Sequence, residues 1–142
     1  MKQVFVLIFV LFFHYCTAQP PIAWNKLLGG NRTEIGRAFQ QTSDGGFIIA
    51  GSSNTSPANG DVSQSSRGAI DYWIVKLNTN GNKTWDKRFG GYSTETPYSI
   101  QQTNDGGYII AGVSYSSEDG DVSGINHGSS DYWIVKLDAD GN

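Results

Sequence analysis

The sequence contains an internal duplication, which constrains the fold more than any other feature. Residues 22–54 match residues 83–115 with 17 identities in 33 positions. Residues 60–82 match residues 120–142 with 14 identities in 23 positions, and the heptapeptide DYWIVKL is the same in both copies. A duplication of this length indicates one supersecondary unit written twice, so the fold must accommodate two equivalent units that stack on each other.

The duplication divides the chain into four segments: an N-terminal segment (1–18), a short lead (19–21), repeat 1 (22–82) and repeat 2 (83–142). Glycine, at 18 of 142 residues, is about twice as frequent as the usual ~7%. Sixteen of these glycines occupy matched positions in the two repeats. Glycine at a fixed repeat position indicates a turn with positive φ, so we expect many tight turns.

Each repeat is predicted to fold as a four-stranded antiparallel β-meander. In repeat 2 the β-rich runs are 83–89, 98–103, 108–114 and 131–137, and repeat 1 opens with a matching run at 22–28. Asp-Gly and Asn-Gly pairs between such runs are strong hairpin signals. We therefore expect an all-β fold, with no helix after the N-terminal segment.

The duplicated strand DYWIVKL is apolar on both faces. In repeat 1, Trp73, Val75 and Leu77 alternate with Tyr72 and Ile74. A half-buried strand would alternate apolar with polar residues, so this strand is expected to be covered on both sides. Repeated radially, such sheets are the blades of a β-propeller; the alternative is an ordinary two-sheet sandwich.

Two blades are fewer than the roughly four to eight that close a propeller. An open pair leaves an apolar blade face at each end, and about five uncovered side chains at about 2 kcal/mol each would cost about 10 kcal/mol. We therefore expect an incomplete propeller. Either the chain is a fragment of a longer array with further blades, or it self-associates.

The N-terminal segment has the features of a signal peptide. Lys2 precedes the apolar run 4–13, and Ala18 is a small residue suited to cleavage. The run is ten residues long, whereas a membrane span needs about 20, which argues against the alternative of a membrane anchor. We expect cleavage after Ala18, a secreted, extracellular or cell-surface location, and no stable membrane span in the mature chain.

The composition of the mature chain excludes several function classes. Removal of the N-terminal segment takes away the only cysteine, so neither an internal disulfide nor a thiol nucleophile is expected. It leaves nine basic residues (ten without Lys2) against 13 acidic ones, a net charge of −4. This mild acidity, without a basic cluster, argues against nucleic acid as a partner.

Four motifs carry a resemblance to a known class of protein. The patterns W-x-K-x-x-GG, QQT-x-DGG-[FY]-IIAG, GDVS and DYWIVKL-x-x-x-GN resemble the propeller-like repeats of secreted bacterial surface proteins, often those exported by the type IX route. The resemblance covers residues 22–142. It implies a β-propeller fold and an extracellular or cell-surface setting, and it implies no catalytic residues. Such proteins usually carry more repeats and a C-terminal sorting domain, neither of which is seen in this sequence.

One acidic loop is a candidate metal site. Glu118, Asp119 and Asp121 lie together in the sequence EDGDVSG of repeat 2, and calcium prefers several hard oxygen ligands. Repeat 1 reads NGDVS at the same place and keeps only Asp61. The alternative is a solvated acidic loop without metal. No other cofactor is expected.

The loop before each DYWIVKL strand is the most divergent part of the repeat. Gln64 and Arg67 of repeat 1 align with Gly124 and His127 of repeat 2, and Asn126 lies beside His127. Because loops on a rigid scaffold carry most binding sites, we interpret Gln64, Arg67, Asn126 and His127 as candidate ligand residues. The sequence marks no partner that would let His127 act as a general base.

Two functions fit these features. The first is a non-catalytic binding module for an unknown protein or glycan. The alternative is an accessory propeller of a secreted carbohydrate-active enzyme, because Asp44 and Asp105 stand in TSDGG and TNDGG turns that resemble the Asp-box turns of sialidase-like propellers. An aspartate in such a turn more often braces the turn by accepting backbone N–H groups. No catalytic residue is assigned.

Overall fold

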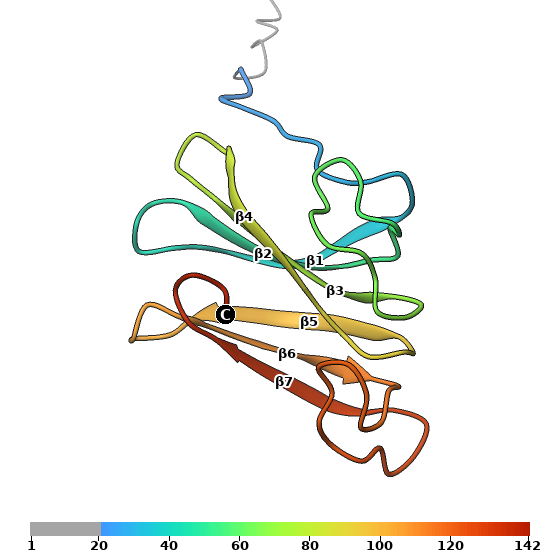
Figure 1. Cartoon of the computed structure of the whole chain (residues 1–142). Coiled ribbons are helices and arrows are strands. Elements are labelled where there is room, and N and C mark those ends of the chain that lie inside the picture. Colours follow the sequence, from blue (N-terminus) through green and yellow to red (C-terminus); the bar gives the residue numbers. More distant parts are fainter. Residues whose placement is uncertain (1–20) are drawn as a thin grey trace, which may run out of the picture.

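The computed structural model describes residues 21–142, and this part of the chain contains β-strands and no helix. The strands are β1 (Glu34–Gln41), β2 (Phe47–Ser53), β3 (Asp71–Leu77), β4 (Lys83–Phe89), β5 (Glu95–Gln102), β6 (Tyr108–Ser114) and β7 (Asp131–Leu137). They form two antiparallel sheets, a first sheet of order β1-β2-β3-β4 and a second sheet of order β5-β6-β7, which do not close into a barrel (Figure 1). No helix suited to crossing a membrane occurs within these residues. The all-β prediction is confirmed, and the predicted signal peptide lies outside the described residues.

Glycine turns close the two equivalent hairpins. Between β1 and β2 the amide of Thr42 donates to Gly46 O at 2.9 Å, and Gly45 adopts a φ of +79°. Between β5 and β6 the matching glycine, Gly106, adopts a φ of +83°. Residues with a Cβ rarely adopt this conformation. The glycine repeated at this position therefore marks where each hairpin turns.

The strand β4 belongs to repeat 2 in the sequence and to the first sheet in space. It pairs antiparallel with β3, with Tyr72 opposite Phe89 and Trp73 opposite Arg88. The expectation of two four-stranded sheets is thereby corrected, because the sheets have four and three strands. The cause is local: residues 78–82 form a tight turn, which returns the chain along the strand that precedes it.

The sequence predicts a strand at residues 22–28, and the structure corrects this, because no strand lies there. The equivalent segment of repeat 2, β4, finds a partner in β3, whereas no strand pairs with 22–28 in the described chain. The segment still makes a contact that resembles one of β4. The ring of Trp24 packs edge-on against Phe47, with centroids 5.6 Å apart, as Trp85 packs against Tyr108 at 5.8 Å.

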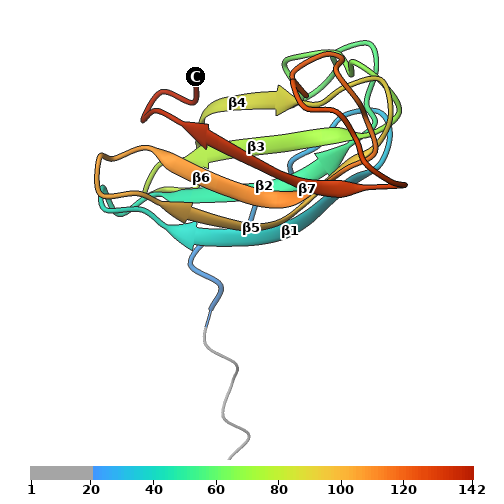
Figure 2. The same cartoon turned by 90° about the horizontal axis from the view of Figure 1, so that it is seen from below.

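The two sheets pack face to face and enclose the main core (Figures 1 and 2). The buried side chains of this core are Ile48, Ala50, Tyr72, Ile74, Ile100, Tyr108, Ile110 and Leu137. The ring of Tyr72 lies 4.7 Å from that of Trp133, and its hydroxyl donates to Trp133 O at 3.2 Å. Burial of each large apolar side chain contributes about 1.5–3 kcal/mol, so this layer holds the sheets together.

The two copies of DYWIVKL lie in different surroundings. In β3 the side chains of Tyr72 and Ile74 are both 0% exposed, whereas their counterparts in β7, Tyr132 and Ile134, are 92% and 63% exposed. The other face of β3 is also covered, since Trp73 belongs to a second buried cluster. Coverage on both faces is therefore confirmed for β3, while one face of β7 is open.

Candidate functional site

The long loops that precede β3 and β7 lie at the same end of the two sheets (Figures 1 and 2). A repeated aspartate fastens each loop. In repeat 1 the amide of Gly29 donates to Asp61 Oδ2 at 3.1 Å, and the amide of Asp61 donates back to Gly29 O at 2.9 Å. Gly90 and Asp121 make the same pair of hydrogen bonds in repeat 2, at 3.0 and 2.9 Å. The GDVS motif therefore holds its loop against the Gly-Gly segment.

The predicted calcium ligands are engaged in hydrogen bonds and an ion pair. The carboxylate of Asp119 accepts from the amide of Tyr92 at 2.6 Å, and that of Asp121 lies 3.1 Å from Arg67 Nε. Glu118 has a φ of 49° in the turn beside them. Among residues 21–142 no group of three or more His, Cys, Asp or Glu side chains is arranged to hold a metal ion. A calcium site in this loop stays a prediction.

Gln64 and Arg67, two of the predicted ligand residues, surround a buried arginine. Gln64 Oε1 accepts from the amide of Arg88 at 2.7 Å, and Arg67 Nη1 donates to Arg88 O at 3.0 Å. The amide of Arg67 also donates to Asp71 Oδ2 at 2.9 Å. Arg67 therefore links β3 to β4 at the end of the first sheet, and Gln64 fastens the loop to β4.

The other two predicted ligand residues lie at the equivalent place on the second sheet. The amide of His127 donates to Asp131 Oδ2 at 2.7 Å, and its ring, 83% exposed, lies 3.5 Å from the same carboxylate. Asn126 Nδ2 reaches Ser114 O at 3.4 Å. The structure thus does not gather Gln64, Arg67, Asn126 and His127 into one site but divides them between two equivalent positions.

A buried ion pair in the first sheet was missed by the sequence analysis. Arg88 Nη2 lies 3.2 Å from Asp71 Oδ2, and both side chains are 0% exposed. The guanidinium also donates to the carbonyl oxygens of Ser53 and Thr55. Burial is the main influence on both groups: it lowers the pKa of Arg88 and raises the pKa of Asp71, and their mutual attraction opposes both shifts.

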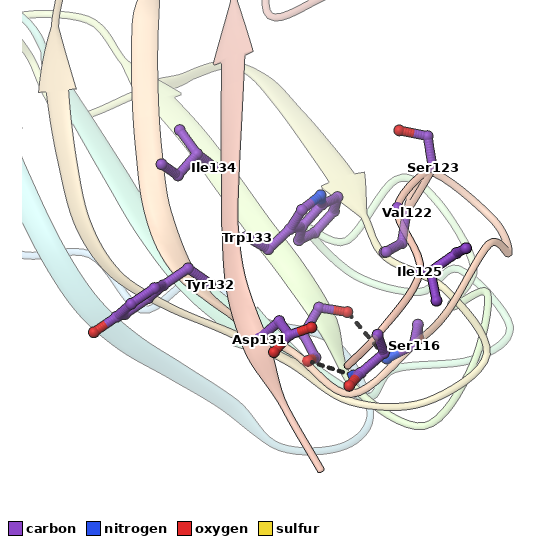
Figure 3. Close-up of a pocket in the computed structure, with 11 residues that line it drawn as sticks. Ser116, Val122, Ser123, Ile125, Asp131, Tyr132, Trp133 and Ile134 are labelled. Carbon is purple, nitrogen blue, oxygen red and sulfur yellow. Dashed lines mark hydrogen bonds between the residues drawn. The ribbon is translucent and has the colours of Figure 1, made fainter. Parts of the chain in front are cut away.

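The equivalent position on the second sheet is a pocket, with a volume of about 330 Å³. It lies beside β7, and Asp131, Trp133 and Ser116 border it (Figure 3). Two serines on its wall are fixed by a buried carboxylate: Glu95 Oε1 accepts from Ser114 Oγ at 2.8 Å and from Ser116 Oγ at 2.7 Å. We take this pocket and the open face of β7 as the candidate binding site.

The Asp-box-like turns use their aspartates internally. Asp44 Oδ2 lies 2.8 Å from Lys76 Nζ, and Asp44 Oδ1 accepts from the amide of Gly46 at 2.9 Å. Asp105 makes the same contacts with Lys136 and Gly107. The lysine hydrogen bond is the largest cause that holds the pKa of both aspartates well below the ordinary range. These contacts are those of a braced turn.

Two comparisons with known proteins found no relative of this chain. The chain matches none of the protein-family models against which it was scanned, and a search of the curated proteins found no match. The resemblance to propeller-like repeats thus rests on the motifs and the duplication.

Proposed function

We propose that this chain is a secreted or cell-surface module of β-propeller-type repeats that acts by binding and not by catalysis. Residues 1–18 serve as its signal peptide, and each sheet is a blade. The sharing of β4 between repeat 2 and the first sheet supports the blade interpretation, because a strand contributed by the following repeat links successive blades of such an array.

One observation carries the proposal: the same heptapeptide is buried in β3 and open in β7. Tyr132 and Ile134 expose 92% and 63% of their surfaces on adjacent positions of one face. Large apolar side chains that lie together on a surface mark interaction sites. The pocket beside them adds polar groups that give such a surface specificity.

The chemistry of the site favours binding over catalysis. Within the described residues, the pocket contains the carboxylate of Asp131 and several serines, but no base is hydrogen-bonded to a serine hydroxyl there other than the buried Glu95. The hydroxyls of Ser114 and Ser116 donate to Glu95, which fixes them as structural groups. Nucleophilic catalysis needs a nucleophile held by a base and facing the substrate.

Two measurements test the proposal. N-terminal sequencing of the exported chain should begin at Gln19 if the signal peptide is cleaved as proposed. The mature chain should bind probes on arrays of glycans and extracellular-matrix proteins, and Ile134→Lys should weaken that binding at least about tenfold, because a charge on this face must be desolvated. If Ile134→Lys leaves the binding unchanged, the binding site does not lie on this face of β7. Reproducible hydrolysis of chromogenic glycosides would overturn the non-catalytic assignment.

A further inference from the structure

We propose that the open edge of β7 docks an extended peptide strand with an arginine three residues after a tryptophan, and that the pocket beside β7 receives the guanidinium. The inference rests on the proposed function, because it names a partner for the same surface. It comes from the difference between two identical strands. β3 has β4 on its outer edge, whereas β7 has no strand on that edge in the described chain.

The first sheet shows how a strand of this kind is held. Arg88 of β4 donates to Ser53 O at 2.6 Å, to Gln64 O at 3.2 Å and to the carbonyl of Thr55, and it pairs with Asp71 at 3.2 Å. A guanidinium has five N–H donors and no acceptor, so a ring of carbonyl oxygens closed by a carboxylate suits it.

The pocket of the second sheet has the same ring. The repeat alignment pairs the four residues that contact Arg88 with four residues that line the pocket, namely Ser114, Ser116, Gly124 and Asp131. Within the described chain no cation other than the exposed His127 ring approaches Asp131. The pocket of about 330 Å³ lies beside β7 (Figure 3), and through these four residues it corresponds in the repeat alignment to the surroundings of Arg88 in the first sheet.

Asp86 Oδ2 of β4 accepts two hydrogen bonds, and the equivalent donors beside β7 have no acceptor in the described chain. Asp86 Oδ2 accepts from the indole N–H of Trp73 and from the amide of Ser63, both at 2.9 Å. The equivalent donors beside β7 are Trp133 Nε1 and the amide of Ser123, and neither makes a hydrogen bond within residues 21–142. A partner strand therefore needs an acceptor two residues before its arginine.

These requirements select between two possible strands. Residues 22–28 of a second copy align with β4, but they place Leu27 at the position of Arg88 and Asn25 at that of Asp86. A leucine would cover Asp131 and the pocket carbonyls without donating to them, and unpaired buried acceptors are costly. The favoured occupant is therefore a strand with the chemistry of β4, containing Trp-Asp-x-Arg, and not residues 22–28 of a second copy.

Peptide titration tests the inference. A fluorescently labelled peptide of residues 82–91 is added to the mature chain and its binding is followed by anisotropy. Two matched peptides serve as controls: the same peptide with Arg88→Leu, and the natural peptide of residues 21–30. We expect the 82–91 peptide to bind and both controls to bind at least about tenfold more weakly. Asp131→Asn in the protein should weaken the 82–91 peptide by a similar factor.

Hydrogen exchange locates the bound peptide, and protection should appear on β7. Protection on β3 would show that the peptide displaces β4, and it would overturn the proposal. Equal or tighter binding of the 21–30 peptide would also overturn it, in favour of a second copy as the occupant. If no peptide binds while the array probes still bind in an Ile134-dependent manner, the partner assignment fails and the proposed function stands. Peptide binding on β7 without any array binding would support the partner assignment and count against glycans and matrix proteins as ligands.

Discussion

Removal of the buried guanidinium of Arg88 should be one of the most destabilising single changes in the first sheet, because it leaves buried acceptors and a buried carboxylate without their partner. In Arg88→Leu, the carbonyls of Ser53 and Thr55 lose a charged donor, and Asp71 loses the cation that lies 3.2 Å away. Each unpaired buried acceptor costs about 1–3 kcal/mol. Removal of one member of a buried ion pair costs about 3–5 kcal/mol in total. We therefore expect the free energy of unfolding to fall by about 3–5 kcal/mol.

Urea unfolding followed by tryptophan fluorescence measures this change at neutral pH. The control is Lys87→Leu, the same substitution at the neighbouring position of β4, where Lys87 Nζ makes only an exposed hydrogen bond to Asn142 at 3.1 Å. It should change the free energy of unfolding by no more than about 0.5 kcal/mol. An Arg88→Leu cost below about 1 kcal/mol, or equal to that of the control, would refute the reasoning that the buried charge supports the fold.

Three further predictions use matched positions. Tyr72→Ala should destabilise by about 3–5 kcal/mol, because the ring is fully buried. Tyr132→Ala, at the same place in the other heptapeptide, should change stability by less than about 0.5 kcal/mol in the same urea assay. Gly120→Ala should cost at least about 1–2 kcal/mol, because its φ is +56° and a Cβ would meet a backbone carbonyl at 2.3 Å. Gly124→Ala, with open space around it, should be nearly neutral by thermal unfolding. For Asp86, burial raises the pKa, but hydrogen bonds from a lysine, a backbone amide and an indole outweigh burial and lower the pKa overall. Its stabilisation should therefore be complete above about pH 4, the unfolded value, and should be lost as pH falls through the lower folded value. Asp86→Asn should weaken this dependence of the free energy of unfolding on acid pH. An unchanged dependence on acid pH in Asp86→Asn would contradict the prediction.

The strand positions could largely be predicted because glycine residues mark the turns between the strands. The runs 83–89, 108–114 and 131–137 coincide with strands of the structure. The strand predicted at 98–103 begins earlier, at Glu95. Glu95 is a buried carboxylate that accepts hydrogen bonds from Ser114 at the end of β6 and from Ser116 in the loop before β7, and such a polar anchor leaves no trace in a hydrophobic pattern.

The candidate site was harder to predict because it depends on contacts between distant segments. A strand reading KTWDKRF has the mixed composition of an outer strand, and nothing in it shows that Arg88 is enclosed. The enclosure arises when the loop that contains Gln64 and Arg67 folds over β4. Sequence divergence marked this loop as a candidate, but it could not show that one copy is filled by an arginine and the other is open.

The placement of β4 has a practical consequence for anyone who shortens or extends this protein. A cut between residues 82 and 83 follows the sequence repeat, but it removes the outer strand from one sheet and leaves that strand without support. A shortened chain that ends at residue 89 would keep all four strands of the first sheet, together with the Gly29 contact that fastens the loop before β3. The strand β4 belongs to repeat 2 in the covalent chain and to the first sheet in the fold. The two sheets should therefore unfold in a single cooperative transition and not one after the other.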